Sequence, residues 1–255
     1  LHLGSPPARL ANAGRMNARG ISVFYGSTTT QTAIAEVRPP VGAKVAVARF
    51  GIIRPLRLLD LTALEHVQDG GSIFDPTLKH RLERVAFLQS LGQRMTRPVM
   101  PDDEAFDYLA TQAIADFLAT ENEPIVDGII FRSIQVKNGR NVVLFHKAAR
   151  VDEIAIPKGT EIEAHSYHDT GEGPEIDYWV SESVPPPTPS SAKGNGWSGV
   201  MFLPGASYDP DADIRDTTLR VDLESVQVHW VDWVSYRCTT HKVRRHRFEK
   251  HDPKF

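Results

Sequence analysis

The chain has 255 residues, of which 41% are hydrophobic, and its formal net charge is −3. This length can bury a sizeable core in one domain, and the balanced charge makes neither nucleic acid nor a membrane surface an expected partner. A single cysteine, Cys238, excludes an internal disulfide framework and favours a reducing cytoplasm. No apolar run approaches the roughly 20 residues that span a bilayer.

The first predicted elements are a strand and a helix. Residues 21–26 alternate and are rich in β-formers, so they predict a strand. Ser27 and the three threonines after it offer hydroxyls that cap a helix, which Pro39 and Pro40 then end. Glu36 is therefore expected near the end of this helix.

Further elements follow up to residue 150. Strands are predicted at 44–50, 56–61, 128–131 and 142–145, and helices at 79–91 and 102–120. The second helix carries an apolar face that we expect to pack on the sheet, made of Phe106, Leu109, Ala110, Ala113, Ile114 and Phe117. Asn138-Gly139 signals a hairpin turn between the last two strands, with Ser133 just after the first of them.

Residues 151–255 are predicted to be a β-rich continuation of the domain formed by residues 1–150. Strands are expected at 162–167, 176–184 and 219–236, and the last is long enough to contain a bend. Residues 185–196 form a proline-rich segment, which predicts an irregular surface loop.

Arg15, Tyr25 and Glu36 follow one another at spacings of 10 and 11 residues across a loop, a strand and a helix. An arginine fork suits phosphate, a tyrosine offers a ring face and a glutamate offers a fixed negative charge. Together they suit an anionic ligand with a flat cationic group. The alternatives are a surface ion pair for Arg15, core packing for Tyr25 and a solvated side chain for Glu36.

Other motifs point to chemistry less strongly. His165, His168 and Asp169, or Cys238 with His241, lack the four-ligand pattern of a structural zinc site, so we expect no metal. The basic residues 241–247 have no interleaved aromatic side chains and predict a solvated tail. The glycines form neither a Rossmann fingerprint nor a Walker loop.

Several ordered segments together resemble the RES family, over about residues 9–150. They are Gly-Arg-Met-Asn at 14–17, Phe-Tyr-Gly at 24–26, Thr-Ala-Ile-Ala-Glu-Val-Arg-Pro at 32–39, Asp-Gly-Ile-Ile-Phe-Arg-Ser at 127–133 and Asn-Val-Val-Leu-Phe at 141–145. The resemblance implies an α/β (α+β) fold like that of ADP-ribosyltransferases, with a bent, split sheet flanked by helices. Arg132 stands where family members carry a proline.

The resemblance also implies an activity, a bacterial toxin that cleaves the nicotinamide–ribose bond of NAD by hydrolysis or phosphorolysis. Arg15 would hold the pyrophosphate, Tyr25 the nicotinamide end and Glu36 the developing ribosyl cation. Ser133 would orient the ribose or amide; as a serine after a strand, it is otherwise a turn former. NAD would be the substrate, with inorganic phosphate as an optional co-substrate and no true cofactor.

The implied partners and the alternatives follow from the same family. An antitoxin or an upstream regulatory domain is the expected partner, and homo-oligomerisation stays open. Leu1 is not a methionine, and we expect upstream residues that include a further family arginine. The alternative activities are ADP-ribosyl transfer to a protein or other macromolecule, and nucleotide or partner binding without turnover.

Overall fold

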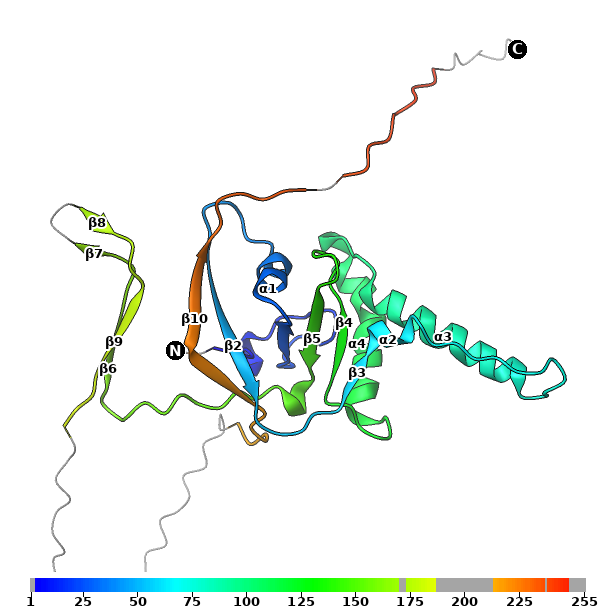
Figure 1. Ribbon diagram of the computed structural model, residues 1–255, viewed down its shortest axis with the longest axis horizontal. Coiled ribbons are helices and arrows are strands. Elements are labelled where there is room, and N and C mark those ends of the chain that lie inside the picture. Colours follow the sequence, from blue (N-terminus) through cyan, green and yellow to red (C-terminus); the bar gives the residue numbers. More distant parts are fainter. Residues whose placement is uncertain (1–2, 170–172, 187–212, 237, 248–255) are drawn as a thin grey trace, which may run out of the picture.

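The computed structural model describes residues 3–169, 173–186, 213–236 and 238–247, and it has the predicted α+β class (Figure 1). The helices are α1 (Thr30–Val37), α2 (Leu61–Leu64), α3 (Leu78–Thr96) and α4 (Glu104–Thr120). The strands of the first 150 residues are β1 (Phe24–Ser27), β2 (Lys44–Ile52), β3 (Leu58–Asp60), β4 (Gly128–Arg132) and β5 (Arg140–Leu144). Short 3₁₀ helices are η1 (Ala8–Leu10), η2 (Pro101–Asp103) and η3 (His146–Ala148).

The strands are divided between separate sheets. The largest sheet in the described residues has the order β1-β5-β4-β3, with β3 parallel to β4 and the other pairs antiparallel. β2 pairs with β10 (Leu219–Trp230) in a second sheet, and α1 packs against strands of both sheets (Figure 1). β6 (Glu161–His165) pairs with β9 (Trp179–Ser183), and β7 (His168–Asp169) pairs with β8 (Pro174–Glu175). The sheet is therefore split, as predicted.

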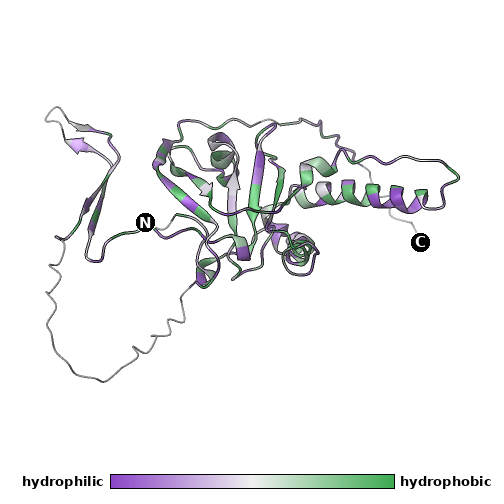
Figure 2. Cartoon of the chain, turned by 60° about the horizontal axis from the view of Figure 1, so that its bottom comes forward, coloured by the Kyte–Doolittle hydropathy of each residue, from purple (hydrophilic) through white to green (hydrophobic). Residues whose placement is uncertain are grey.

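The four-stranded sheet is buried on both faces. Because side chains alternate along a strand, Ile129 and Val143 enter a core shared with Leu118 of α4 and Met95 of α3. The opposite face contributes Leu144 to a second core, where Leu219 and Phe50 arrive from the β2–β10 sheet. Figure 2 shows apolar stretches within the strands at the centre of the molecule, beside polar ends. Burial on both faces explains their nearly continuous apolar sequences.

The buried face of α4 differs from the predicted one. Thr111, Ala115 and Leu118 are buried, whereas Phe106, Leu109 and Phe117 are exposed. Apolar side chains occur on more than one side of this helix, so its sequence is compatible with two different buried faces. Ala115 and Leu118 instead join the core formed with Ile129 and Val143.

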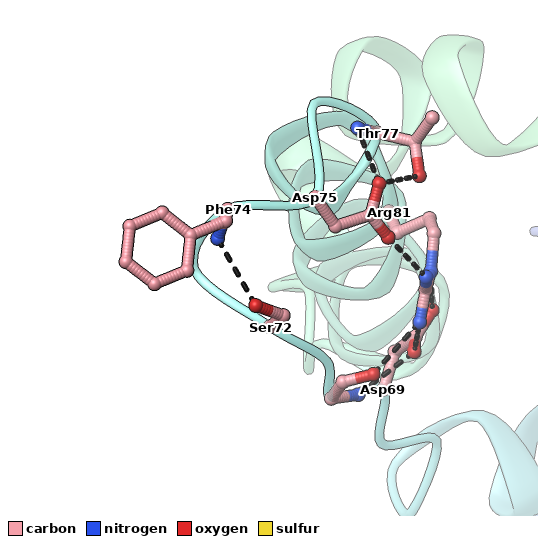
Figure 3. A network of polar contacts seen from close by, with 7 residues as sticks. Asp69, Ser72, Phe74, Asp75, Thr77 and Arg81 are labelled. Atoms are coloured by element: carbon pink, nitrogen blue, oxygen red, sulfur yellow. Dashed lines mark hydrogen bonds and ion pairs between the residues drawn. The ribbon is translucent and has the colours of Figure 1, made fainter.

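The loop before α3 is held by one arginine. Arg81 on α3 binds the carboxylates of Asp69 and Asp75, and Asp75 also accepts hydrogen bonds from the backbone and side chain of Thr77 (Figure 3). These contacts hold the start of α3, which is longer than predicted. Phe74 points away from this network and is 87% exposed.

The segment after residue 150 does not extend the largest sheet. The predicted strand 219–236 ends at Trp230, and its register on β2 shifts between Asp222 and Gln227, which is the predicted bend. Most of the proline-rich loop, residues 187–212, lies outside the described residues. None of the helices in the described part of the chain combines the length and apolar character that crossing a membrane requires.

Candidate active site

Glu36, on the last turn of α1, is held by two side chains from other elements. Its Oε1 accepts a hydrogen bond from Ser133 Oγ at 2.6 Å and another from Asn141 Nδ2 at 2.8 Å. Ser133 and Asn141 are buried, with 5% and 6% of their surface exposed, whereas Glu36 itself is exposed. The carboxylate is thus anchored at one oxygen while part of it faces solvent.

The hydroxyl of Ser133 has a fixed role in this contact. Its oxygen accepts hydrogen bonds from the backbone N–H groups of Gln135 and Val136, both at 3.1 Å. A hydroxyl has one hydrogen and two acceptor positions, so its hydrogen is left for Glu36. This arrangement suits a serine that orients the carboxylate, and it is poorly suited to a serine that attacks a substrate.

Local structure brings α1 against the loop that carries Ser133. Thr29 caps α1 by accepting from Thr32 N, as the threonine run predicted. A side chain at Gly139 would meet Thr32 Oγ1 at 2.8 Å and Ser133 Cβ at 3.1 Å, so only glycine allows this approach. The connection is longer than a two-residue hairpin because Ser133 N bonds Gly139 O across it, while Asn138 adopts a φ of 65° in the turn.

Arg38 ends α1 in a left-handed conformation, with φ 47°. With the Gln135 amide oriented so that its oxygen faces the guanidinium, Arg38 donates to that oxygen from Nε and Nη2 at 3.0 and 2.9 Å. Arg38 therefore ties the end of α1 to the loop that carries Ser133. Glu36 makes its contact with Ser133 between the same helix and the same loop.

Tyr25 lies on β1, two residues before Ser27 and therefore on the same face of the sheet. Its hydroxyl donates to Asn17 Oδ1 at 2.9 Å and accepts from Met16 N at 3.1 Å. Burial of the hydroxyl raises the pKa of Tyr25 to about 12, although the Met16 hydrogen bond opposes the shift. The residue as a whole is 47% exposed, so the ring is accessible while the hydroxyl is enclosed.

Arg15 is joined to the end of α3 and to the first half of α4. Its Nη1 donates to the carbonyl oxygens of Met95 and Arg97, and its guanidinium lies 5.2 Å from the centre of the Tyr108 ring. The fork has five N–H groups, and these two bonds use Nη1 alone. Arg15 thus has a structural role that the sequence did not indicate. It is connected to Tyr25 through its neighbour Met16, whereas Glu36 and Ser133 meet directly.

Sequence reasoning did not single out Asn141 and Ser27 as site residues. Ser27 Oγ donates to Asn141 Oδ1 at 2.7 Å, and Asn141 then donates to Glu36. The available signal was an asparagine in a strand, where that residue is disfavoured. Arg132 pairs with Glu65 at 3.1 Å and alternates to the opposite face from Asn141, so this departure from the family pattern does not touch Glu36.

An apolar hollow of about 490 Å³ lies beside these residues, not at Glu36. Its walls include Ile21, Leu109 and Phe145, together with Met16 and Asn17, which bind the Tyr25 hydroxyl. A mostly apolar lining does not favour the phosphates of a dinucleotide. The polar network around Glu36 is therefore the better candidate for the chemistry.

The residues weighed as metal ligands do not gather into a cluster. Over the described ranges, no group of three or more His, Cys, Asp or Glu side chains could hold a metal ion. His165 instead stacks on Trp179 with ring centres 3.9 Å apart, and Cys238 is an exposed free thiol.

The chain has the α+β class and the split sheet that the sequence predicted, and the fold brings Glu36 and Ser133 into direct contact. The family model described as the RES domain matches residues 3–168, which is more than half of the chain. The chain therefore belongs to the RES domain family. Comparisons with curated proteins and with solved structures gave no match.

Proposed function

We propose that this chain cleaves the nicotinamide–ribose bond of NAD, and that Glu36 is its catalytic carboxylate. The observation that carries the proposal is an exposed carboxylate whose Oε1 is fixed by two buried donors, Ser133 and Asn141. Membership of the RES family, a toxin-like class of domain, supports it.

The chemistry needs a fixed negative charge and little else from the protein. As the bond breaks, its electron pair leaves with nicotinamide, whose ring becomes neutral, and positive charge develops on the ribose. A preorganised carboxylate stabilises that charge without having to reorient. Water or inorganic phosphate then bonds to the ribose carbon. Water loses a proton to solvent and gives ADP-ribose, whereas phosphate gives a phosphorylated ADP-ribose.

Arg15 and Tyr25 are proposed to bind the rest of the dinucleotide. The accessible ring of Tyr25 offers a stacking surface for nicotinamide. N–H groups of Arg15 other than Nη1 would donate to a pyrophosphate oxygen, while the bonds of Nη1 to the end of α3 hold the fork in place. NAD is in this view a substrate and not a resident cofactor.

ADP-ribosyl transfer to a macromolecule is the second candidate, and the exposure of Glu36 favours it because an open carboxylate leaves room for a large acceptor. Incubation of the purified chain with labelled NAD, with and without inorganic phosphate, distinguishes the products. Free ADP-ribose or its phosphorylated form supports NAD consumption, and label retained on a macromolecule supports transfer. Binding without nicotinamide release would leave the non-catalytic alternative.

The toxin role predicts an effect in cells. Expression in bacteria should arrest growth and lower the NAD pool, and the matched Glu36→Gln variant should do neither. Unchanged NAD on expression of the soluble wild-type chain would contradict the proposal.

A further inference from the structure

We infer that Asn141, supported by Ser27, is a positioning residue that fixes which oxygen of the Glu36 carboxylate is presented to substrate. The inference rests on the proposed function for its catalytic consequence, but the contact itself does not. It joins β1, β5 and α1 through two hydrogen bonds, Ser27 to Asn141 at 2.7 Å and Asn141 to Glu36 at 2.8 Å.

The direction of these bonds follows from donor and acceptor chemistry. An ionised carboxylate only accepts, so the Asn141 NH₂ group must face Glu36 and its Oδ1 must face the other way. Ser27 donates its hydroxyl hydrogen to that oxygen, which prevents the amide from turning over. Ser133 is directed in the same manner by the two backbone N–H groups at its oxygen.

Both donors converge on Oε1. In the described residues, the hydrogen bonds assigned to the Glu36 carboxylate reach this oxygen, which leaves Oε2 as the one that can face a ligand. Rotation of the carboxylate would break two bonds to buried donors at once. The carboxylate is therefore held in one orientation before any substrate arrives, as electrostatic catalysis requires.

The choice of residue at position 141 supports a dedicated role. Asparagine is disfavoured in strands, and the three residues that follow it in β5 are Val, Val and Leu. Asn141 is nevertheless 6% exposed and pairs in register with Ser27 on one side and Phe131 on the other. Its amide donates a hydrogen bond to Glu36, although a β-branched apolar residue has the higher propensity for this strand position.

The charged neighbours allow a sharp test. Arg38 follows the last residue of α1 with its guanidinium at Gln135, and Arg140 alternates to the opposite face from Asn141. Asn141→Asp would therefore place a single new carboxylate against that of Glu36. Two carboxylates at hydrogen-bond distance share a proton. Asn122→Asp, after the end of α4, makes the same chemical change at a position where the side-chain amide donates to the backbone carbonyl of Pro124 and not to a carboxylate.

The experiment measures both the carboxyl groups and the activity. In ligand-free Asn141→Asp, ¹³C NMR should show the introduced carboxyl group and that of Glu36 titrating as a coupled pair, with one proton taken up at higher pH than by either acid alone. The acid limb of kcat/KM for NAD should move to higher pH in this variant, but not in Asn122→Asp. Independent titration of the two carboxyl groups in a folded variant would overturn the inference.

Two further results keep the inference separate from the proposed function. If the wild-type chain releases no nicotinamide, the proposed function fails. The coupled titration would still test whether residue 141 lies against the Glu36 carboxylate. If Asn141→Asp does not fold, Ser27→Ala replaces it. Removing that hydrogen bond should lower kcat about five-fold with KM little changed, on the scale of about 1 kcal/mol. Unchanged kcat in folded Ser27→Ala would refute the role of the Ser27 support.

Discussion

Replacing Glu36 by glutamine separates the charge of this side chain from its hydrogen bonds. The glutamine oxygen can take the place of Oε1 and accept from both Ser133 and Asn141, while its NH₂ group faces solvent. The negative charge is lost and the local geometry is kept. Glu36→Ala is the matched comparison because it removes the charge and also leaves both buried donors without their partner.

The two variants should differ in stability and agree in activity. A hydrogen bond to a charged group is worth about 1 kcal/mol more than a neutral one, and exposure of Glu36 reduces this, so Glu36→Gln should cost about 1 kcal/mol or less. Glu36→Ala should cost about 1–3 kcal/mol because a buried donor loses its partner. Deleting one preorganised electrostatic group slows catalysis about 10²- to 10³-fold, so both variants should release nicotinamide at least that much more slowly.

Urea unfolding gives the first quantity and nicotinamide release gives the second. Circular dichroism should confirm that Glu36→Gln retains its fold. Activity of this variant within ten-fold of wild type would remove Glu36 from the catalytic role. Equal stability of the two variants would show that the donors at Oε1 do not depend on the carboxylate.

Arg15→Lys should weaken NAD binding and leave nicotinamide affinity little changed, because a point charge cannot replace a bidentate fork. It should also lower stability by loss of the contacts to the end of α3. Equal NAD affinity by calorimetry would contradict the phosphate role. Folding raises the pKa of Tyr25 from 10.0 to about 12, so on raising the pH the tyrosine ionises first in the unfolded chain. The contribution of Tyr25 to stability is therefore full below pH 10 and is lost as the pH rises toward 12. Tyr25→Phe should flatten this fall, as measured by denaturant unfolding across that range, and an equally steep fall would refute the assignment. Gly128→Ala should prevent folding because its Cβ would collide with the backbone carbonyl of Val143, and a folded variant by circular dichroism would contradict this. The control is Gly51→Ala, whose Cβ would meet only the carbonyl oxygen of Arg220 at an ordinary contact distance of 3.8 Å.

The elements that the sequence predicted well are those whose signals are local. The helix α1 begins at a threonine cap and ends before a Pro-Pro pair, and both signals act within a few residues of the chain. The buried face of α4 was predicted only in part, because the choice of face depends on tertiary packing: Ile114 packs against the core, but the two phenylalanines do not. Phe106 and Phe117 are larger than Ala115 and Thr111, so hydrophobicity alone ranked the wrong stripe first.

The site shows the same division between local and tertiary information. Glu36 and Ser133 were singled out by resemblance to a family, but their contact depends on how closely Gly139 lets the β4–β5 loop approach Thr32. The bonds of Arg15 to the end of α3 cross about 80 residues of sequence. Asn141 was seen only as part of a strand motif because its role depends on the register that places it opposite Ser27.

The register between β1 and β5 links the stability of the fold to the geometry of the site. Tyr25 and Ser27 share one face of the sheet with Asn141, whereas Phe24 and Leu144 fill the core on the other face. A slip of one residue would move these polar groups into the core that contains Phe50 and Leu219, and would carry Phe24 and Leu144 to the face that packs against α3 and α4. The packing between the two sheets therefore determines which oxygen of Glu36 is held. For this reason we expect destabilising substitutions in that core to reduce nicotinamide release before they unfold the chain.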